Sequence, residues 1–193
     1  HPAGSAVGSY KYEDVNGDGK ITQDDRAVLG SFFPKYNFGF TNAFKYRNFD
    51  LNILIQGAAG AKMFQNGAFA NLTPSVDANI FKNYVNNYFI SEGNPANGEF
   101  ARPTIPGELL FQDSDFKLKD ASFVRVRNIT LGYTVPEKTI KFIKNLRVYF
   151  STQNPFTFTS YPGYNPEANP KPNGLGVLNP GMDWSAYPVE KSY

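Results

Sequence analysis

The residues with the clearest potential for chemistry lie in the stretch DVNGDGKITQDD, at positions 14–25. Calcium takes about six to eight oxygen ligands, and a loop of roughly twelve residues can supply them from its positions 1, 3, 5, 7 and 12. A glycine at position 6 allows the sharp turn that such a loop needs, and the stretch has one there. The candidate metal ligands are therefore Asp14, Asn16, Asp18, the backbone carbonyl of Lys20, and Asp25.

The last ligand of this loop is Asp25, where the EF-hand pattern has glutamate. The shorter carboxylate can still coordinate, and the stretch resembles a dockerin-type loop. We expect it to hold Ca²⁺ or Mg²⁺ in a structural role. The alternative is a turn without metal, because Asn-Gly and Asp-Gly pairs are ordinary turn signals.

Other catalytic constellations are poorly supported by the sequence. His1 is the only histidine and there is no cysteine, which argues against a Ser-His-Asp hydrolase, thiol catalysis and a cysteine-based zinc site. Asp113, Asp115 and Asp120 could form a glycosidase carboxylate pair, but charged residues in a solvated loop are the simpler interpretation. We therefore expect no enzymatic activity.

The composition indicates an exported β protein. The 193 residues include 18 Phe, 12 Tyr, 17 Gly and 14 Pro. A net charge of +2 without a Lys/Arg cluster argues against nucleic-acid binding, and no apolar run is long enough for a transmembrane helix. The first residues lack the features of a signal peptide, so we expect the chain to begin partway along a longer precursor.

Four segments alternate between apolar and polar residues, which is typical of β-strands with two different faces. They are KYNFGFTNAFKY, LNILIQGAAG, DASFVRVRNITLGYTV and LRVYFSTQNPFTF. In the third segment the alternation changes phase at Asn128, which predicts a β-bulge.

The connections between these strands distinguish a soluble sandwich from a membrane barrel. The links at 47–49 and 136–144 are short, whereas those at 57–118 and 155–191 are far longer than loops in compact domains usually are. Short turns at one end and long loops at the other are typical of an outer-membrane β-barrel, whose apolar face meets lipid. We therefore favour the barrel over the sandwich.

The ordered set YEDVNGDGKITQDDRAVLG, NFGFTNAFKYRNFDLNILIQGAAG, FVRVRNITLGYTVP and LRVYFSTQNPFTF…YPGYNPE resembles the C-terminal part of SusC/RagA-type TonB-linked outer-membrane proteins. The resemblance implies a fragment of a 22-stranded plugged barrel in the bacterial outer membrane. It also implies import of oligosaccharides or peptides, driven through TonB, together with a SusD-like surface lipoprotein. The plug, the TonB-contacting segment, most strands and the final strand would lie outside this chain.

This topology assigns each part of the chain to a loop or a hairpin. We expect an extracellular loop with the metal motif at 1–34, a strand hairpin at 35–59, and a long extracellular loop at 60–117 with a short helix at 81–90. A second hairpin at 118–154 and an extracellular loop at 155–193 that leads to the missing strand complete the chain.

Some side chains would face the barrel interior or its mouth. Arg125 and Arg127 could contact substrate or form a lumen-facing salt-bridge network. Tyr161, Tyr164 and Trp184 could stack on sugar rings, contact a lid protein, or pack within their loop. The competing function is a secreted, calcium-stabilised, β-rich carbohydrate-binding module.

Overall fold

The computed structural model describes residues 7–65, 82–96, 100–102, 114–137, 139–143, 145–167, 181–184 and 186–193. The chain divides into two compact units. One consists of His1–Gly30 and Gln65–Leu118, and the other of Ser31–Phe64 and Lys119–Tyr193.

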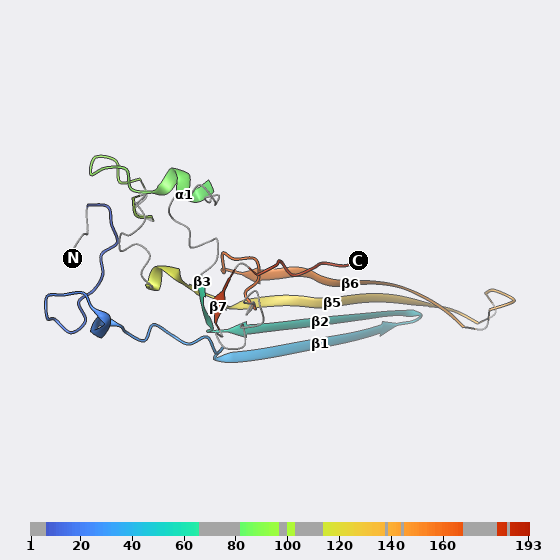
Figure 1. Ribbon diagram of the computed structural model, residues 1–193. Helices are drawn as coiled ribbons and strands as arrows, with labels where there is room; N and C mark the ends of the chain where they lie inside the picture. The colour runs from blue at the N-terminus through green and yellow to red at the C-terminus, as the bar shows by residue number, and fades with distance from the viewer. Residues whose placement is uncertain are drawn as a thin grey trace. The chain divides into compact units, whose positions relative to one another are not determined.

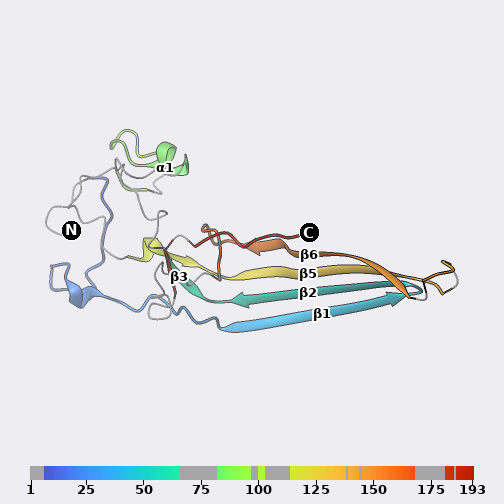
Figure 2. The same cartoon turned by 45° about the vertical axis from the view of Figure 1, so that its right-hand side comes forward.

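A four-stranded antiparallel sheet forms the body of the second unit (Figure 1). Its strands, in spatial order, are β1 (Tyr36–Tyr46), β2 (Phe49–Ala59), β5 (Phe123–Val135) and β6 (Leu146–Thr159). A second view shows the same strands side by side as one elongated sheet (Figure 2). The prediction of antiparallel strands from alternating polarity is confirmed.

The register places the apolar residues of the four strands on one face. Phe40 lies opposite Ile55, Ile55 opposite Val126, and Val126 opposite Phe156. Large side chains of this apolar face are exposed, because no second layer within the described part of the chain covers them. They are Phe38, Phe40, Phe44, Leu131, Val148, Phe150, Phe156 and Phe158.

The sheet has two short connections, and both lie at the same end. Arg47 and Asn48 join β1 to β2, and Arg47 adopts the left-handed conformation with φ 53°. Residues 136–145 join β5 to β6. The pairing of Phe49 with Tyr133 brings both connections to the same end of the sheet, as the sequence predicts for the turn side of a barrel.

A β-bulge interrupts β5 one residue earlier than the alternation predicts. Val126 pairs with Ile55 and Asn128 with Leu54, so Arg127 is the extra residue. On the other side of β5, Val126 pairs with Phe156 and Asn128 with Gln153. The predicted bulge is therefore confirmed, with its unpaired position at Arg127.

β6 extends beyond residue 154, where the sequence predicts that the second hairpin ends. Asn154 has φ 50° and, with Pro155, lies unpaired between Gln153 and Phe156. Pairing then resumes and continues to Thr159. In the structure, Asn154 and Pro155 are therefore an irregularity within one strand.

A smaller sheet contains β4 (Leu118–Asp120), β3 (Lys62–Gln65) and β7 (Met182–Asp183) in that order. The buried apolar cluster of the second unit lies beside it and consists of Ala61, Met63, Ala121 and Tyr161. Many large apolar side chains of the described residues lie on the exposed face of the main sheet and not in this cluster.

The first unit contains α1 (Lys82–Asn87) and two short 3₁₀ turns, η1 (Gln23–Asp25) and η4 (Asp115–Lys117). The helix is shorter than the predicted 81–90, whose first residue lies outside the described residues. Tyr88, directly after the helix, forms a bridge with Phe100 instead. Among the described residues, no helix has the length and apolarity needed to cross a membrane.

Candidate functional site

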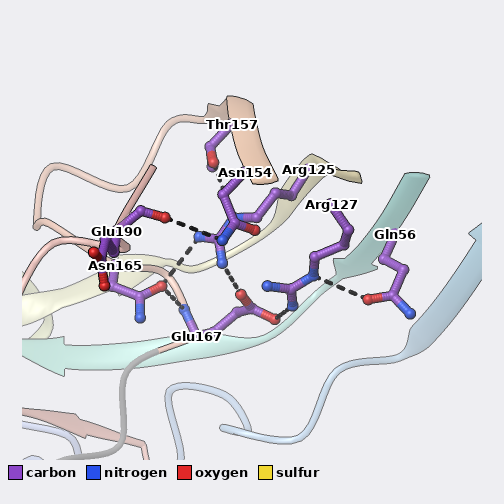
Figure 3. A network of polar contacts seen from close by, with 8 residues as sticks. All are labelled: Gln56, Arg125, Arg127, Asn154, Thr157, Asn165, Glu167 and Glu190. Carbon is purple, nitrogen blue, oxygen red and sulfur yellow. Dashed lines mark hydrogen bonds and ion pairs between the residues drawn. The ribbon is translucent and has the colours of Figure 1, made fainter. Parts of the chain in front are cut away.

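The polar face of β5 carries an extensive network of side-chain contacts (Figure 3). Its centre is Arg125, which is 1% exposed. Arg125 donates through Nε to Thr157 Oγ1 at 2.9 Å and through Nη2 to Asn165 Oδ1 at 3.1 Å. Its Nη1 pairs with the Glu167 carboxylate. All three guanidinium nitrogens are therefore engaged with groups of the chain itself.

Arg127, the extra residue of the bulge, approaches the same carboxylate from one side. Its Nη2 pairs with Glu167, and its Nε donates to Gln56 Oε1 at 2.9 Å. The Glu167 backbone N–H donates to Asn165 Oδ1 at 3.1 Å. Glu167 thus joins two arginines on β5 and holds the segment after β6 against the polar face of the sheet (Figure 3).

A hollow of about 580 Å³ lies beside this network. Its wall is mainly apolar and includes Phe32, Phe38, Met63 and Phe123. The Arg127–Glu167 pair contributes charged groups to the same wall.

The three predicted aromatic contacts lie in different environments. Tyr161 is 4% exposed, and its hydroxyl donates to Asp183 Oδ2 at 2.6 Å. Tyr164 is 60% exposed, and Trp184 is half-buried. Arg125 and Tyr161 are thus held inside the protein, whereas Arg127 and Tyr164 are accessible from outside.

Asp183 was missed by the sequence analysis, although it organises the loop around Tyr161. It is 1% exposed and accepts hydrogen bonds from Tyr161 and from the Ala186 backbone N–H. A Cβ on Gly163 would lie 2.8 Å from Asp183 Oδ2, so only glycine leaves room for this contact. Its sequence context, GMDWSAY, has no periodicity that would distinguish it from a surface aspartate.

Glu167, Asn165, Gln56 and Thr157 were also missed as partners of the predicted arginines. Asn165 and Glu167 belong to YNPE, which reads as a turn. Glu167 is 42 residues from Arg125 in the sequence, so no local pattern connects them. The alternation of polarity along β2 could have placed Gln56 on the polar face, where it is the cross-strand neighbour of Arg125.

In the first unit, the backbone of the Asp-rich loop turns twice through glycine. Gly17 and Gly19 have φ of 76° and 78°. Their N–H groups donate to the two Asp14 carboxylate oxygens at 2.6 and 2.7 Å. The Asp18 N–H donates to Asn16 Oδ1 at 2.9 Å. The loop therefore curls around the side chains that the sequence predicts as ligands.

Asp25 closes the loop onto its beginning. Its carboxylate accepts from the backbone N–H groups of Thr22 at 2.6 Å and Val15 at 3.0 Å. The bond from Thr22 is the main reason that the pKa of Asp25 lies below its usual value. Within the described ranges no group of three acidic, histidine or cysteine side chains has the spacing of a metal cage. The donor set is nevertheless all oxygen, which fits Ca²⁺ or Mg²⁺.

The carboxylates considered for a glycosidase pair, and judged to be charged residues of a solvated loop, fall in different parts of the chain. Asp115 begins η4, and Asp120 ends β4 and accepts from the Ser122 hydroxyl at 2.6 Å. Asp113 lies outside the described residues.

Comparison with known proteins identifies the relatives of this chain. It is 32% identical over 193 residues to TonB-dependent receptor P3 of Formosa agariphila, a match that covers 98% of the chain. The chain is homologous to a segment of a TonB-dependent receptor. TonB-dependent receptor SusC of Bacteroides thetaiotaomicron is 27% identical over 177 residues, or 86% of the chain. The resemblance inferred from the sequence is confirmed.

The chain spans 18% of the length of P3 and 17% of the length of SusC. No family model matches it. Among solved structures, the RagAB peptide transporter aligns with a TM-score of 0.67 at 24% identity, covering 89% of the segment and 18% of that chain. The RagAB peptide importer in the 'open-open' state gives a TM-score of 0.64.

These structural likenesses show that the segment has the fold of part of the RagAB structures. The four-stranded sheet is therefore an incomplete wall and not a closed barrel. The relatives are named as receptors and importers, and none of those compared is named as an enzyme. The alternative of a secreted carbohydrate-binding module finds no support among them.

Proposed function

We propose that this segment forms part of the wall of an outer-membrane, TonB-dependent nutrient importer. The observation that carries the proposal is the exposed apolar face shared by β1, β2, β5 and β6. Such a face is stable in contact with hydrocarbon, where paired strands leave few backbone groups unsatisfied. The opposite face carries Arg125 and its network, as expected for a wet interior.

The short turns would then lie on the periplasmic side and the long connections outside the cell. The cargo would be an oligosaccharide or a peptide, and a SusD-like lipoprotein would close over the mouth. TonB would supply energy through parts of the protein outside this segment. The RagAB structures are those of a peptide importer, but at 24% identity they support the fold and not the cargo.

Within the segment, we assign cargo contact to the accessible members of the predicted set, Arg127 and Tyr164. Arg127 belongs to the wall of the hollow, and the exposed ring of Tyr164 can stack on a sugar or a peptide side chain. Arg125 and Tyr161 have structural roles in this scheme, since their polar groups are engaged inside the protein.

The test is growth of the source bacterium on single nutrients, with the gene for the full-length protein deleted and then restored. Loss of growth on one glycan or one peptide mixture, rescued by the intact gene but not in a strain without TonB, is the expected result. Normal growth of the deletion strain on every nutrient that induces the gene would contradict it. Extraction from membranes without detergent would favour the secreted module instead.

We also propose a structural Ca²⁺ or Mg²⁺ in the Asp-rich loop. Its ligands would be Asp14, Asn16, Asp18, the Lys20 carbonyl and Asp25. The carboxylate oxygens that accept loop N–H groups have further lone pairs with which to bind a cation. A cation would offset the repulsion among these acidic groups and stiffen an extracellular loop. Calorimetric titration of the full-length protein with each cation tests this assignment.

A further inference from the structure

The turn that joins β5 to β6 differs from its neighbour at the same end of the sheet. The β1–β2 connection has two residues, whereas the β5–β6 connection runs through residues 136–145. Within it, the Phe142 side chain is 95% exposed, and Ile140 and Ile143 are 39% and 44% exposed. Three large apolar side chains in one short turn are unusual where only water surrounds them.

Exposed basic side chains accompany these apolar ones. Lys141 lies between Ile140 and Phe142, and Lys45, Arg47 and Arg147 belong to the adjoining strand ends. Among the described residues at this end of the sheet, the only acidic ones are Asp50 and Glu137, compared with these four basic ones. Asp50 is already paired with Arg147. This end of the sheet is therefore positively charged.

Aromatic residues lie between this basic end and the apolar face. Tyr46 is 70% exposed, and the rings of Phe49 and Tyr133 are 4.7 Å apart. The Arg47 guanidinium lies over the Tyr46 ring at 5.4 Å. Along the strands the surface thus changes from apolar to aromatic to basic, the order found from the hydrocarbon to the headgroups of a bilayer.

We propose that the β5–β6 turn inserts Phe142 and its isoleucine neighbours into the adjacent lipid headgroup layer, where Lys141 and Arg47 select anionic phospholipids. This inference rests on the proposed function, because it requires the sheet to stand in a bilayer. Aromatic and aliphatic side chains favour the interface, and basic residues near an anionic surface attract its headgroups. No protein partner is needed to cover these apolar side chains.

The test places a fluorescent label next to the turn in the full-length protein. The segment contains no cysteine, so Thr139→Cys gives one attachment point here once any cysteine elsewhere is replaced. Thr139 is exposed, and its label leaves Phe142 and Lys141 unchanged. The protein is reconstituted in phosphatidylcholine nanodiscs that contain a small, equal fraction of spin-labelled phosphatidylglycerol or spin-labelled phosphatidylcholine.

Quenching by the phosphatidylglycerol probe is expected to exceed quenching by the phosphatidylcholine probe about fivefold. Arg47→Gln with Lys141→Gln should bring this ratio close to one, and Phe142→Ser should weaken quenching by both probes. Lys35→Gln is the matched control, because Lys35 is an exposed lysine just before β1, at the opposite end of the sheet. It should leave the ratio unchanged.

Equal quenching by the two probes would overturn the anionic selectivity. Absence of quenching, with the blue-shifted emission of a buried label, would mean that protein covers the turn and would overturn the inference as a whole. Nutrient uptake is measured separately, in cells whose full-length protein carries the same Thr139→Cys substitution. Uptake without quenching counts against this inference alone, whereas quenching without uptake counts against the proposed function alone.

Discussion

Asp50 on β2 and Arg147 on β6 form an ion pair across the strand that separates them. Arg147 Nε lies 3.1 Å from Asp50 Oδ1, and Nη2 lies 2.5 Å from Oδ2. Asp50 is the direct partner of Gly132 on the intervening β5. A Cβ at Gly132 would lie 2.4 Å from Arg147 Nη2 and 2.6 Å from Asp50 Oδ1. Because glycine has no side chain, Gly132 leaves room for an ion pair that joins β2 to β6 across β5.

Replacement of Gly132 by alanine should displace this ion pair. We expect Gly132→Ala to lower the free energy of unfolding of the full-length protein only modestly, because the pair that it displaces is partly exposed to solvent. In an Arg147→Gln background the same change should cost almost nothing more, because the pair is already gone. Urea unfolding of the four proteins in detergent measures both values. An undiminished cost in that background would point to the backbone of β5 instead.

The strands and the two hairpin pairings, β1 with β2 and β5 with β6, were predictable because their information is local. Alternation with a period of two decides which side chains share a face, and short turns bring neighbouring strands into register. The bulge was placed one residue too late because Arg127 and Asn128 are both polar, so either could be the unpaired residue. Only the pairing of β2 with β5 distinguishes them.

The contacts of the candidate site were less predictable. Arg125 and Arg127 were found from their positions on the polar face, but their shared partner Glu167 lies in a turn-rich segment without periodicity. The same holds for Tyr161, whose exposure could not be inferred without Asp183, 22 residues away. Local spacing predicts the turn at Gly19 in the Asp-rich loop. It does not predict which loop folds back onto which strand.

Loss of the Arg125 guanidinium group should release residues 161–167, the segment that follows β6, from the sheet. We expect Arg125→Lys to lower the local stability of residues 161–167 by about 2–4 kcal/mol, because an ammonium group cannot reach Thr157, Asn165 and Glu167 together. Hydrogen exchange of the backbone amide of Glu167 reports this opening, since that amide bonds to Asn165.

Arg127→Lys is the matched control for this prediction. The Arg127 side chain is 28% exposed and pairs with Gln56 and Glu167, so solvent can replace part of what the substitution removes. We expect a cost of about 1 kcal/mol or less. Equal effects of the two substitutions would show that Arg125 does not hold the segment by its buried geometry.

A chain of hydrogen bonds joins Gly60, which follows β2, to Ser122 and Asp120, which precede β5, and it should be sensitive to acid. The Gly60 N–H donates to Ser122 Oγ at 2.9 Å, and the Ser122 hydroxyl donates to Asp120 Oδ1 at 2.6 Å. The bond from the hydroxyl and a second from the Ser122 backbone N–H lower the pKa of Asp120 below its usual 3.8. Ionised Asp120 therefore contributes fully above that value, and its contribution is lost as the pH falls through the lowered pKa.

Hydrogen exchange of the Gly60 amide, corrected for intrinsic rates, should show this loss as the pH is lowered from about 5 to about 2. Ser122→Ala removes the middle of the chain, so protection of Gly60 should be low and independent of pH over this range. A wild-type protein whose Gly60 protection does not change with pH would show that Asp120 does not act through Ser122.

The Asp-rich loop should gain resistance to protease when calcium is added. Lys20 is exposed at the centre of the loop and offers a trypsin site, and coordination by its own carbonyl would hold that backbone in place. We expect Asp25→Asn to weaken calcium binding by at least about tenfold, because the loop loses the charge that closes it. Asp24→Asn removes an equal charge one residue away, but Asp24 is outside the ligand positions and its backbone N–H bonds to Thr22 Oγ1. It should therefore bind calcium almost normally. Equal weakening by both substitutions would mean that calcium binding depends on the net charge of the loop and not on a coordination site. Protection from protease by calcium that persists in Asp25→Asn would show that Asp25 is not a ligand.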